Sequence, residues 1–328
     1  MPASDSIPLL DMEPFLSGDE QEARRAASAF GRTFEEIGFA CIVGHGVPEE
    51  TISRAYNAAR NFFDLPEADK RESAISDRVK DRGYVPIGVE SVAITQDAIQ
   101  PPDLCEALVF NAINNEPCAP QPGSTSDVTG NIYPRTPPDL APALHDYFLH
   151  VNNLASNLMQ LAAMALELPK EFFEPHTNRR RGRLRVVNYP DQLIEPLPGQ
   201  LRYGAHSDYG SFTILRPDDA PGGLQVRMPN GAWENVPSVQ GAFVINIGDL
   251  MARWTNDRWK STLHRVANPP RDLSGTTRRI SMAFFTGVNG DAMIECLPSC
   301  RSASVGAKYP PVRAADYIAQ KLNVSMVA

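Results

Sequence analysis

The chain has 328 residues, of which 42% are hydrophobic and 21% are charged, and its formal net charge is −8. This length and composition are typical of a globular protein that can bury a full hydrophobic core. The negative charge argues against nucleic acid as a partner, since nucleic-acid binding normally needs a basic face. The one basic run, at residues 179–185, lacks interleaved aromatic residues and is predicted to be a solvated surface.

Membrane-targeting and disulfide patterns are both missing from the sequence. No apolar run reaches the roughly 20 residues of a membrane-spanning helix, and the N-terminus has no signal-peptide pattern, so no membrane partner is expected. The five cysteines are an odd number without a CxxC pair and are predicted to be reduced thiols. Together these features predict a cytoplasmic protein. No coiled-coil stripe indicates an oligomeric state.

The N-terminal part of the chain is predicted to combine helices with strands. A short strand at 7–11 is followed by a helix whose apolar residues recur every three or four positions up to Ile37. Residues 39–43 are a continuous apolar run typical of a buried strand, and a second amphipathic helix begins near Pro48. Residues 1–116 are therefore predicted to form helices plus strands that join the core.

The middle of the chain contains a predicted linker and a long helix. Residues 117–138 are rich in Pro, Gly, Ser and Thr and are predicted to be a loop or linker. Within 139–178, a helical apolar periodicity from about Leu140 to Leu166 predicts one long packing helix.

Beyond residue 179, short apolar segments alternate with turn residues. The eight predicted strands are Leu184–Tyr189, Leu201–His206, Phe212–Leu215, Leu224–Arg227, Trp233–Val236, Ala242–Ile247, Ser261–Val266 and Arg279–Thr286. This pattern predicts an α+β protein with a β-sandwich or jelly-roll core at 179–290, flanked by helices. Residues 291–328 are predicted to be a C-terminal extension ending in a helix.

A candidate metal site lies in the segment Gly204–Gly210. His206 and Asp208 are two residues apart, so on an extended chain they point to the same side and can bind one ion. His264, from a distant strand, would complete a 2-His-1-carboxylate face, which is the usual ligand set of non-haem Fe(II) oxygenases. Zinc could use the same three ligands for hydrolysis. However, the sequence contains no HExxH or GxSxG motif and no evident general base beside the triad.

A candidate carboxylate receptor follows the second histidine. Arg279 and Ser281 share one side of a predicted strand, where a guanidinium next to a hydroxyl can bind a carboxylate. A metal face together with this receptor predicts an Fe(II) enzyme with an acidic cosubstrate.

These motifs together resemble the isopenicillin N synthase-like branch of the Fe(II)/2-oxoglutarate-dependent dioxygenases, and the resemblance covers almost the whole chain. The matching segments are 34–39, 44–48, 82–84, 204–215, 222–226, 244–249 and 264–266. The resemblance implies a double-stranded β-helix, or jelly-roll, core with a helical N-terminal region. It also implies that Fe(II) is bound by His206, Asp208 and His264.

The resemblance further implies the cosubstrates and the reaction. 2-Oxoglutarate would bind Arg279 and Ser281 through its distal carboxylate, with help from the hydroxyl of Tyr189. With O2, the cosubstrate would be converted to succinate and CO2 while a small-molecule substrate is hydroxylated, desaturated or closed into a ring.

Three residues are candidates for the substrate pocket. Arg82 and Tyr84 occupy positions at which family members often touch substrate. Phe285, in the segment Ala283-Phe284-Phe285, is a candidate pocket wall, although most aromatic residues at strand spacing belong to the core. Val187 stands where many plant members have Asn, so the sequence does not transfer a substrate from any plant enzyme.

Other functions compatible with the sequence remain. The Arg-x-Ser pair also occurs in isopenicillin N synthase-like oxidases, which use Fe(II) and O2 without 2-oxoglutarate. An ethylene-forming enzyme would fragment 2-oxoglutarate itself. A non-catalytic binding protein is disfavoured, because it would have no reason to keep the triad together with Arg279, Ser281 and Tyr189.

Overall fold

The structure is a computed structural model that describes residues 6–75, 82–92, 101–111, 131–179, 182–272, 274–301 and 306–325. Most of the predicted linker at 117–138 lies outside these residues. Within the described ranges, no helix combines the length and the apolarity that crossing a bilayer would require. The four cysteines in these ranges are free thiols.

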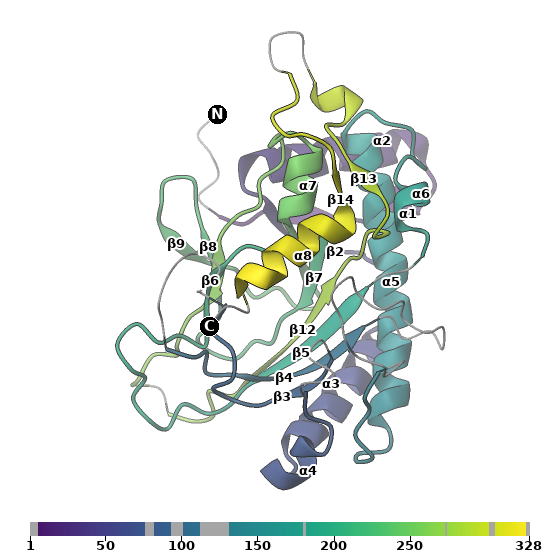
Figure 1. Cartoon of the computed structure of the whole chain (residues 1–328). Coiled ribbons are helices and arrows are strands. Elements are labelled where there is room, and N and C mark those ends of the chain that lie inside the picture. Colours follow the sequence, from purple (N-terminus) through teal and green to yellow (C-terminus); the bar gives the residue numbers. More distant parts are fainter. Residues whose placement is uncertain are drawn as a thin grey trace.

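Two β-sheets form the centre of the molecule (Figure 1). The larger sheet contains β1 (Leu9–Asp11), β2 (Phe39–Val43), β3 (Gly83–Val85), β4 (Glu106–Asn111), β5 (Arg183–Tyr189), β7 (Phe212–Arg216), β10 (Phe243–Ile247) and β12 (Arg279–Phe285). Its strand order is β1-β2-β10-β7-β12-β5-β4-β3. The smaller sheet contains β6 (Tyr203–His206), β8 (Leu224–Arg227), β9 (Trp233–Asn235) and β11 (His264–Val266), in the order β6-β11-β8-β9.

The predicted α+β jelly-roll fold is confirmed. All eight strands predicted after residue 179 are present, and strands from the N-terminal part extend the larger sheet at both edges. β11 begins at His264 rather than at Ser261. The preceding side chains explain this shift, because Ser261 bonds the Asp249 carboxylate and Thr262 bonds the carbonyl of Ile37.

Helices cover one face of the larger sheet. They are α1 (Glu13–Leu16), α2 (Glu20–Glu36), α3 (Glu49–Phe63), α4 (Glu67–Arg71), α5 (Leu140–Ala165) and α6 (Glu174–Thr177). α5 is the predicted long helix, and Figure 1 shows it running beside the sheet together with α2 and α3. The main hydrophobic core lies between these helices and the sheet, and side chains such as Phe34, Leu158 and Phe284 contribute to it.

The opposite face of the larger sheet packs against the smaller sheet. Two separate apolar clusters fill this space, one around Phe39 and Val226 and the other around Val187, Tyr189 and Val266. Successive residues of a strand point to opposite faces, so each central strand sends alternate side chains to the helices and to the smaller sheet. The candidate active site lies on the face that points to the smaller sheet.

The C-terminal segment packs against α7 (Asp249–Trp254). It contains β13 (Met293–Ile294), β14 (Val312–Arg313) and α8 (Ala314–Ser325), the predicted terminal helix. Figure 1 shows α8 crossing in front of the strands next to α7, where Lys321 pairs with Asp249 at 2.8 Å.

Gly38 fixes the junction between α2 and β2. Its φ is +78°, and a Cβ at this position would lie 2.1 Å from the carbonyl oxygen of Lys260 and 2.8 Å from Oγ1 of Thr262. Both contacts belong to the segment that leads into His264. Glycine is therefore required here by backbone conformation and by space.

We expect Gly38→Ala to destabilise the protein more than Gly18→Ala. Gly18 has a similar φ of +84°, but a methyl group added there would have nothing within 4 Å. Its substitution should cost only the left-handed backbone penalty of roughly 1–2 kcal/mol. At Gly38 the steric overlap should add about 1–3 kcal/mol. Urea unfolding of both variants measures the difference, and equal losses would contradict the packing argument.

Candidate active site

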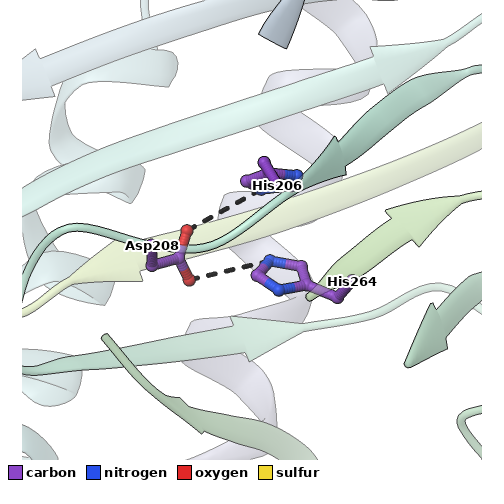
Figure 2. A group of neighbouring side chains, drawn as sticks. All are labelled: His206, Asp208 and His264. Carbon is purple, nitrogen blue, oxygen red and sulfur yellow. Dashed lines mark ion pairs between the residues drawn. The ribbon is translucent and has the colours of Figure 1, made fainter. Parts of the chain in front are cut away.

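Three metal-ligating side chains meet at one point between the sheets (Figure 2). β6 and β11 are antiparallel neighbours, and their pairing sets His264 directly opposite His206. Asp208 follows β6 in the next loop. Nε2 of His206 lies 3.8 Å from Oδ1 of Asp208, and Nε2 of His264 lies 3.7 Å from Oδ2. These distances are too long for hydrogen bonds, so the three groups face a shared space rather than one another.

Backbone carbonyls fix the orientation of both imidazoles. Nδ1 of His206 is 2.9 Å from the oxygen of Gly204, and Nδ1 of His264 is 3.1 Å from the oxygen of Thr262. A carbonyl oxygen only accepts, so each Nδ1 carries the proton and each Nε2 presents a lone pair. Burial, together with neighbouring His264, lowers the pKa of His206, which keeps that ring neutral near pH 7. Both rings are thus prepared as metal ligands.

Two hydrogen bonds hold the Asp208 carboxylate in place. Thr213 on β7 donates through Oγ1 to Oδ2, and Asn246 on β10 donates through Nδ2 to the same oxygen at 2.7 Å. Burial would raise the pKa of Asp208, but His264, His206 and these two hydrogen bonds hold it below its usual value. The carboxylate is therefore ionised. Oδ1 receives no hydrogen bond from the described residues, so it is the oxygen free to bind a metal.

The donor set fits Fe(II). Two imidazole nitrogens and one carboxylate oxygen on one face are the ligands of non-haem Fe(II) oxygenases, although zinc accepts the same atoms. The three ligand atoms lie within 4.8 Å of one another. Among the residues that the structure describes, this is the one cluster of three or more potential ligands with such spacing.

Arg279 is a buried guanidinium without a carboxylate partner among the described side chains. It is 4% exposed, its Nη1 donates to the carbonyl of Ala220 at 3.1 Å, and its Nε has no hydrogen-bond partner. Asp218 is close by but accepts hydrogen bonds from Tyr56 and from the backbone of Ile280. A Cβ at Gly223 would lie 3.5 Å from Nη1, an ordinary van der Waals contact, so Gly223 borders the guanidinium.

A buried and unpaired charge is costly, so the Arg279 site fits an anionic ligand. Tyr189 lies directly opposite Arg279 across the β5–β12 ladder, and Ser281 follows on the same side of β12. Burial raises the pKa of Tyr189, so its hydroxyl stays protonated and can donate to a carboxylate. The structure thus brings together all three residues predicted to receive 2-oxoglutarate, on the face of the larger sheet that carries the metal ligands' supports.

Phe285 belongs to the same face. It is opposite Thr213 in the β7–β12 ladder, and Thr213 is the residue that bonds Asp208. Residues directly opposite on antiparallel strands point to the same side. The neighbouring Phe284 points the other way, into the helix-covered core. This position is the one expected for a wall of the substrate pocket.

Tyr84 lies on the opposite face of the sheet. It is 0% exposed, packs in the helix-covered core near Phe62, and bonds Glu67 and Glu106 through its hydroxyl. Arg82 is buried just before β3. The position of Tyr84 favours a structural role over contact with substrate.

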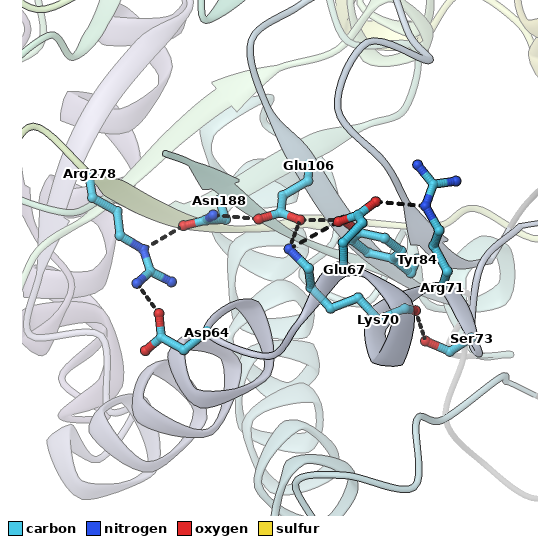
Figure 3. A network of polar contacts seen from close by, with 9 residues as sticks. All are labelled: Asp64, Glu67, Lys70, Arg71, Ser73, Tyr84, Glu106, Asn188 and Arg278. Carbon is cyan, nitrogen blue, oxygen red and sulfur yellow. Dashed lines mark hydrogen bonds and ion pairs between the residues drawn. The ribbon is translucent and has the colours of Figure 1, made fainter. Parts of the chain in front are cut away.

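Tyr84 is part of a polar network that joins α3 and α4 to the sheet (Figure 3). Glu106 accepts hydrogen bonds from Tyr84, from Lys70 at 2.7 Å and from Asn188 at 2.7 Å. Asn188 in turn accepts from Arg278, which also pairs with Asp64 (Figure 3). Asn188 and Arg278 immediately precede Tyr189 and Arg279, so the network supports the carboxylate receptor from behind.

Two features of the site were not evident from sequence. Thr213 is a key support for Asp208, but no motif marks it, and only the strand pairing brings it there. The prediction of a solvated surface was wrong for Arg185, which is buried on β5. Arg185 is four residues before Tyr189 on a predicted strand, so both side chains were expected on the same face. His45 donates to the carbonyl of Gly241 at 2.8 Å and packs on Phe243, which gives it a structural role.

Known proteins match the chain in both halves. The family model of the 2OG-Fe(II) oxygenase superfamily matches residues 182–288, and the model of the N-terminal region of non-haem dioxygenases in morphine synthesis matches residues 7–128. The 2-oxoglutarate-Fe(II) type oxidoreductase hxnY of Emericella nidulans is 32% identical over 95% of this chain and 88% of its own. Validamycin A dioxygenase of Streptomyces hygroscopicus subsp. limoneus is 29% identical over 98% and 87%.

The chain is also similar to solved structures of proteins in complex with 2-oxoglutarate. A full-length Neurospora crassa protein in complex with alpha-KG and thymine superposes with a TM-score of 0.84 at 30% identity, covering 97% of this chain and 96% of that one. JOX2 in complex with 2OG, Fe and JA superposes with a TM-score of 0.75 at 28% identity, covering 96% and 84%.

We expect Asn246→Ala to weaken metal binding about 10- to 100-fold, the usual effect of removing a residue that orients a ligand. Asn246 bonds Asp208 directly, so its loss frees the carboxylate to rotate. Titration of metal-free protein with Fe(II) in the absence of oxygen measures the change. Asn235→Ala is the matched control, because Asn235 makes an exposed hydrogen bond to Gln225. Equal affinities of the two variants would show that Asn246 does not orient the ligand.

Proposed function

This chain belongs to the 2OG-Fe(II) oxygenase superfamily, and from that premise we propose which of its residues carry each part of the reaction. The metal ligands are His206, Asp208 and His264. The distal carboxylate of 2-oxoglutarate binds Arg279, Ser281 and Tyr189. The protein is an Fe(II)- and 2-oxoglutarate-dependent dioxygenase, and its oxygen-derived oxidant acts on a small molecule.

The observation that carries the proposal is the grouping of an ionised carboxylate with two imidazoles that all face one space. When bound, Fe(II) and 2-oxoglutarate supply the O2-dependent oxidation, in which the cosubstrate becomes succinate and CO2. The protein supplies the geometry. Thr213 and Asn246 hold Asp208 through Oδ2, and the carbonyls of Gly204 and Thr262 hold the two rings.

Arg279 orients the cosubstrate. Its guanidinium is a buried cation on the face of the metal site, and a dicarboxylate bound there presents its other end toward the triad. Ser281 and Tyr189 donate hydrogen bonds to the same carboxylate. These contacts are charge-assisted and are made in a dry environment, where they are stronger than in water.

The primary substrate is a small molecule that occupies the face lined by Phe285, Ala283 and Val187. These side chains are on the same side of β12 and β5 as Arg279. Their apolar character excludes water from the reacting centre, which protects a reactive oxidant from side reactions. The complexes of the Neurospora crassa protein with thymine and of JOX2 with JA support a small-molecule substrate.

We expect Arg279→Ala to weaken 2-oxoglutarate binding by about 2–4 kcal/mol, the cost of removing one partner of a buried charged pair. Iron affinity should not change, because Arg279 does not touch the triad. Fe(II)-loaded protein is titrated with 2-oxoglutarate without oxygen, and the weak visible absorption of the metal–cosubstrate chelate is followed. Arg227→Ala, on an exposed position of β8, is the matched control.

Each rival function gives a different result in this titration. Absence of the absorption band in wild-type protein that has bound iron would favour an isopenicillin N synthase-like oxidase. A band with normal affinity in Arg279→Ala would overturn the role of Arg279. Ethylene release from 2-oxoglutarate in air, without another substrate, would identify an ethylene-forming enzyme. A band without any succinate formation in air would favour a binding protein.

A further inference from the structure

Arg202 is a buried guanidinium at the start of the strand that carries a metal ligand. It is 1% exposed and immediately precedes β6, which ends at His206. The four hydrogen bonds that its Nη atoms make with the described residues all go to backbone carbonyls. A planar guanidinium can bond several carbonyls at once, so it can join parts of the backbone that are far apart in the sequence.

The carbonyls bound by Arg202 belong to three separate segments of the chain. Nη1 donates to the oxygen of Pro221 at 2.9 Å and to the oxygen of Gly222 at 3.3 Å. Nη2 donates to the oxygen of Thr277 and, at 3.5 Å, to the oxygen of Pro190. The side chain therefore connects β6 to the end of β5, to the start of β12 and to the loop before β8.

Each of these segments also carries part of the proposed cosubstrate receptor. Pro190 directly follows Tyr189, and Thr277 precedes Arg279 by two residues. In the segment 220–223, the carbonyl of the first residue accepts from Nη1 of Arg279 at 3.1 Å, and the last residue borders the same atom. One side chain thus holds the three pieces of backbone that surround the guanidinium of Arg279.

Arg202 also brings a second positive charge to this region. Its acceptors among the described residues are neutral carbonyls. Burial, together with neighbouring Arg279, lowers the pKa of Arg202 to about 10, so the side chain is still a cation at pH 7. Asp191 and Asp218 offset this effect only in part. Two buried cations are costly without an anion, and a carboxylate bound at Arg279 supplies one.

We propose that Arg202 is a positioning residue for 2-oxoglutarate, which holds the Arg279 receptor at a fixed place relative to His206 and adds a charge that favours the distal carboxylate. A dicarboxylate that binds Arg279 at one end and reaches the metal at the other needs a fixed separation between the two points. Arg202 sets this separation because it is bonded to the receptor and lies four residues before His206 on the same segment. It acts through the backbone and does not need to touch the cosubstrate.

A purely structural role of Arg202 makes a different prediction. Loss of a structural contact lowers the thermal stability and weakens the binding of all cosubstrates alike. Loss of a positioning residue weakens chiefly the ligand that uses the distal carboxylate receptor. The ratio of two affinities, for ligands with and without that carboxylate, separates the two roles.

This inference rests on the proposed function, because it assigns Arg202 a role toward the cosubstrate. The two ligands of the test are 2-oxoglutarate and 2-oxopentanoate, which has the same keto-acid end but a methyl group in place of the distal carboxylate. Fe(II)-loaded protein is titrated with each compound without oxygen, and the visible absorption of the chelate is followed. Wild-type protein should bind 2-oxoglutarate more tightly.

Two variants test Arg202. Arg202→Lys keeps the charge but loses the planar fork, so the ratio of the two affinities should fall. Arg202→Met removes the charge as well, so the ratio should fall at least about 10-fold. The affinity for Fe(II) alone should not change. Arg253→Lys is the matched control, because half-buried Arg253 on α7 also donates to a backbone carbonyl, that of Pro310 at 2.6 Å.

An unchanged ratio in either variant that folds as wild type does would overturn the role of Arg202, whatever the loss of thermal stability. If Arg202→Met does not fold, Arg202→Lys alone decides. The binding of 2-oxoglutarate to wild-type protein separates this inference from the proposed function. Failure of wild-type protein to bind 2-oxoglutarate overturns the proposed function, whereas normal binding with an unchanged ratio in the variants overturns only the role of Arg202.

Discussion

The fixed carboxylate of Asp208 is the feature on which the rest of the site depends. Thr213 and Asn246 come from adjacent strands of the larger sheet and both bond Oδ2, while the histidines come from the smaller sheet. The metal site therefore joins the two sheets of the jelly roll. An ionised carboxylate can be buried there because hydrogen bonds and a bound cation compensate the loss of water. Packing of the sheets and binding of the metal consequently support each other.

The two faces of strands β5 and β12 have different roles: one carries the candidate active site, and the other packs against the helices. On one face lie Tyr189 and Arg279, which we propose to bind the cosubstrate, and Arg185, which is buried beside Tyr203. On the other, the residues next to them join the core or the network around Glu106 (Figure 3). Because neighbours on a strand point to opposite sides, a rigid set of contacts to the helices lies directly behind each ligand-binding side chain.

The two-residue spacing of His206 and Asp208 indicated that both could reach one ion, and the pairing of β11 with β6 brings His264 to them. The strands after residue 179 were predictable because short apolar segments alternate there with turn residues. Burial of Arg185 was not, because the partner that neutralises it, Glu90, is 95 positions away in the sequence. The face on which Tyr84 lies was not predictable either, because it depends on the register of the edge strand β3 with β4. The position and direction of these single polar side chains depend on contacts between residues far apart in the chain, which the sequence alone does not reveal.

The central claim is that one face of this jelly roll holds iron and directs 2-oxoglutarate from Arg279. The most direct test is a crystal structure of the Fe(II) and 2-oxoglutarate complex grown without oxygen. We expect iron bonded to Nε2 of both histidines and to Oδ1 of Asp208, with the distal carboxylate of the cosubstrate on the guanidinium of Arg279. Iron at another site, or a cosubstrate carboxylate that does not contact Arg279, would contradict the account.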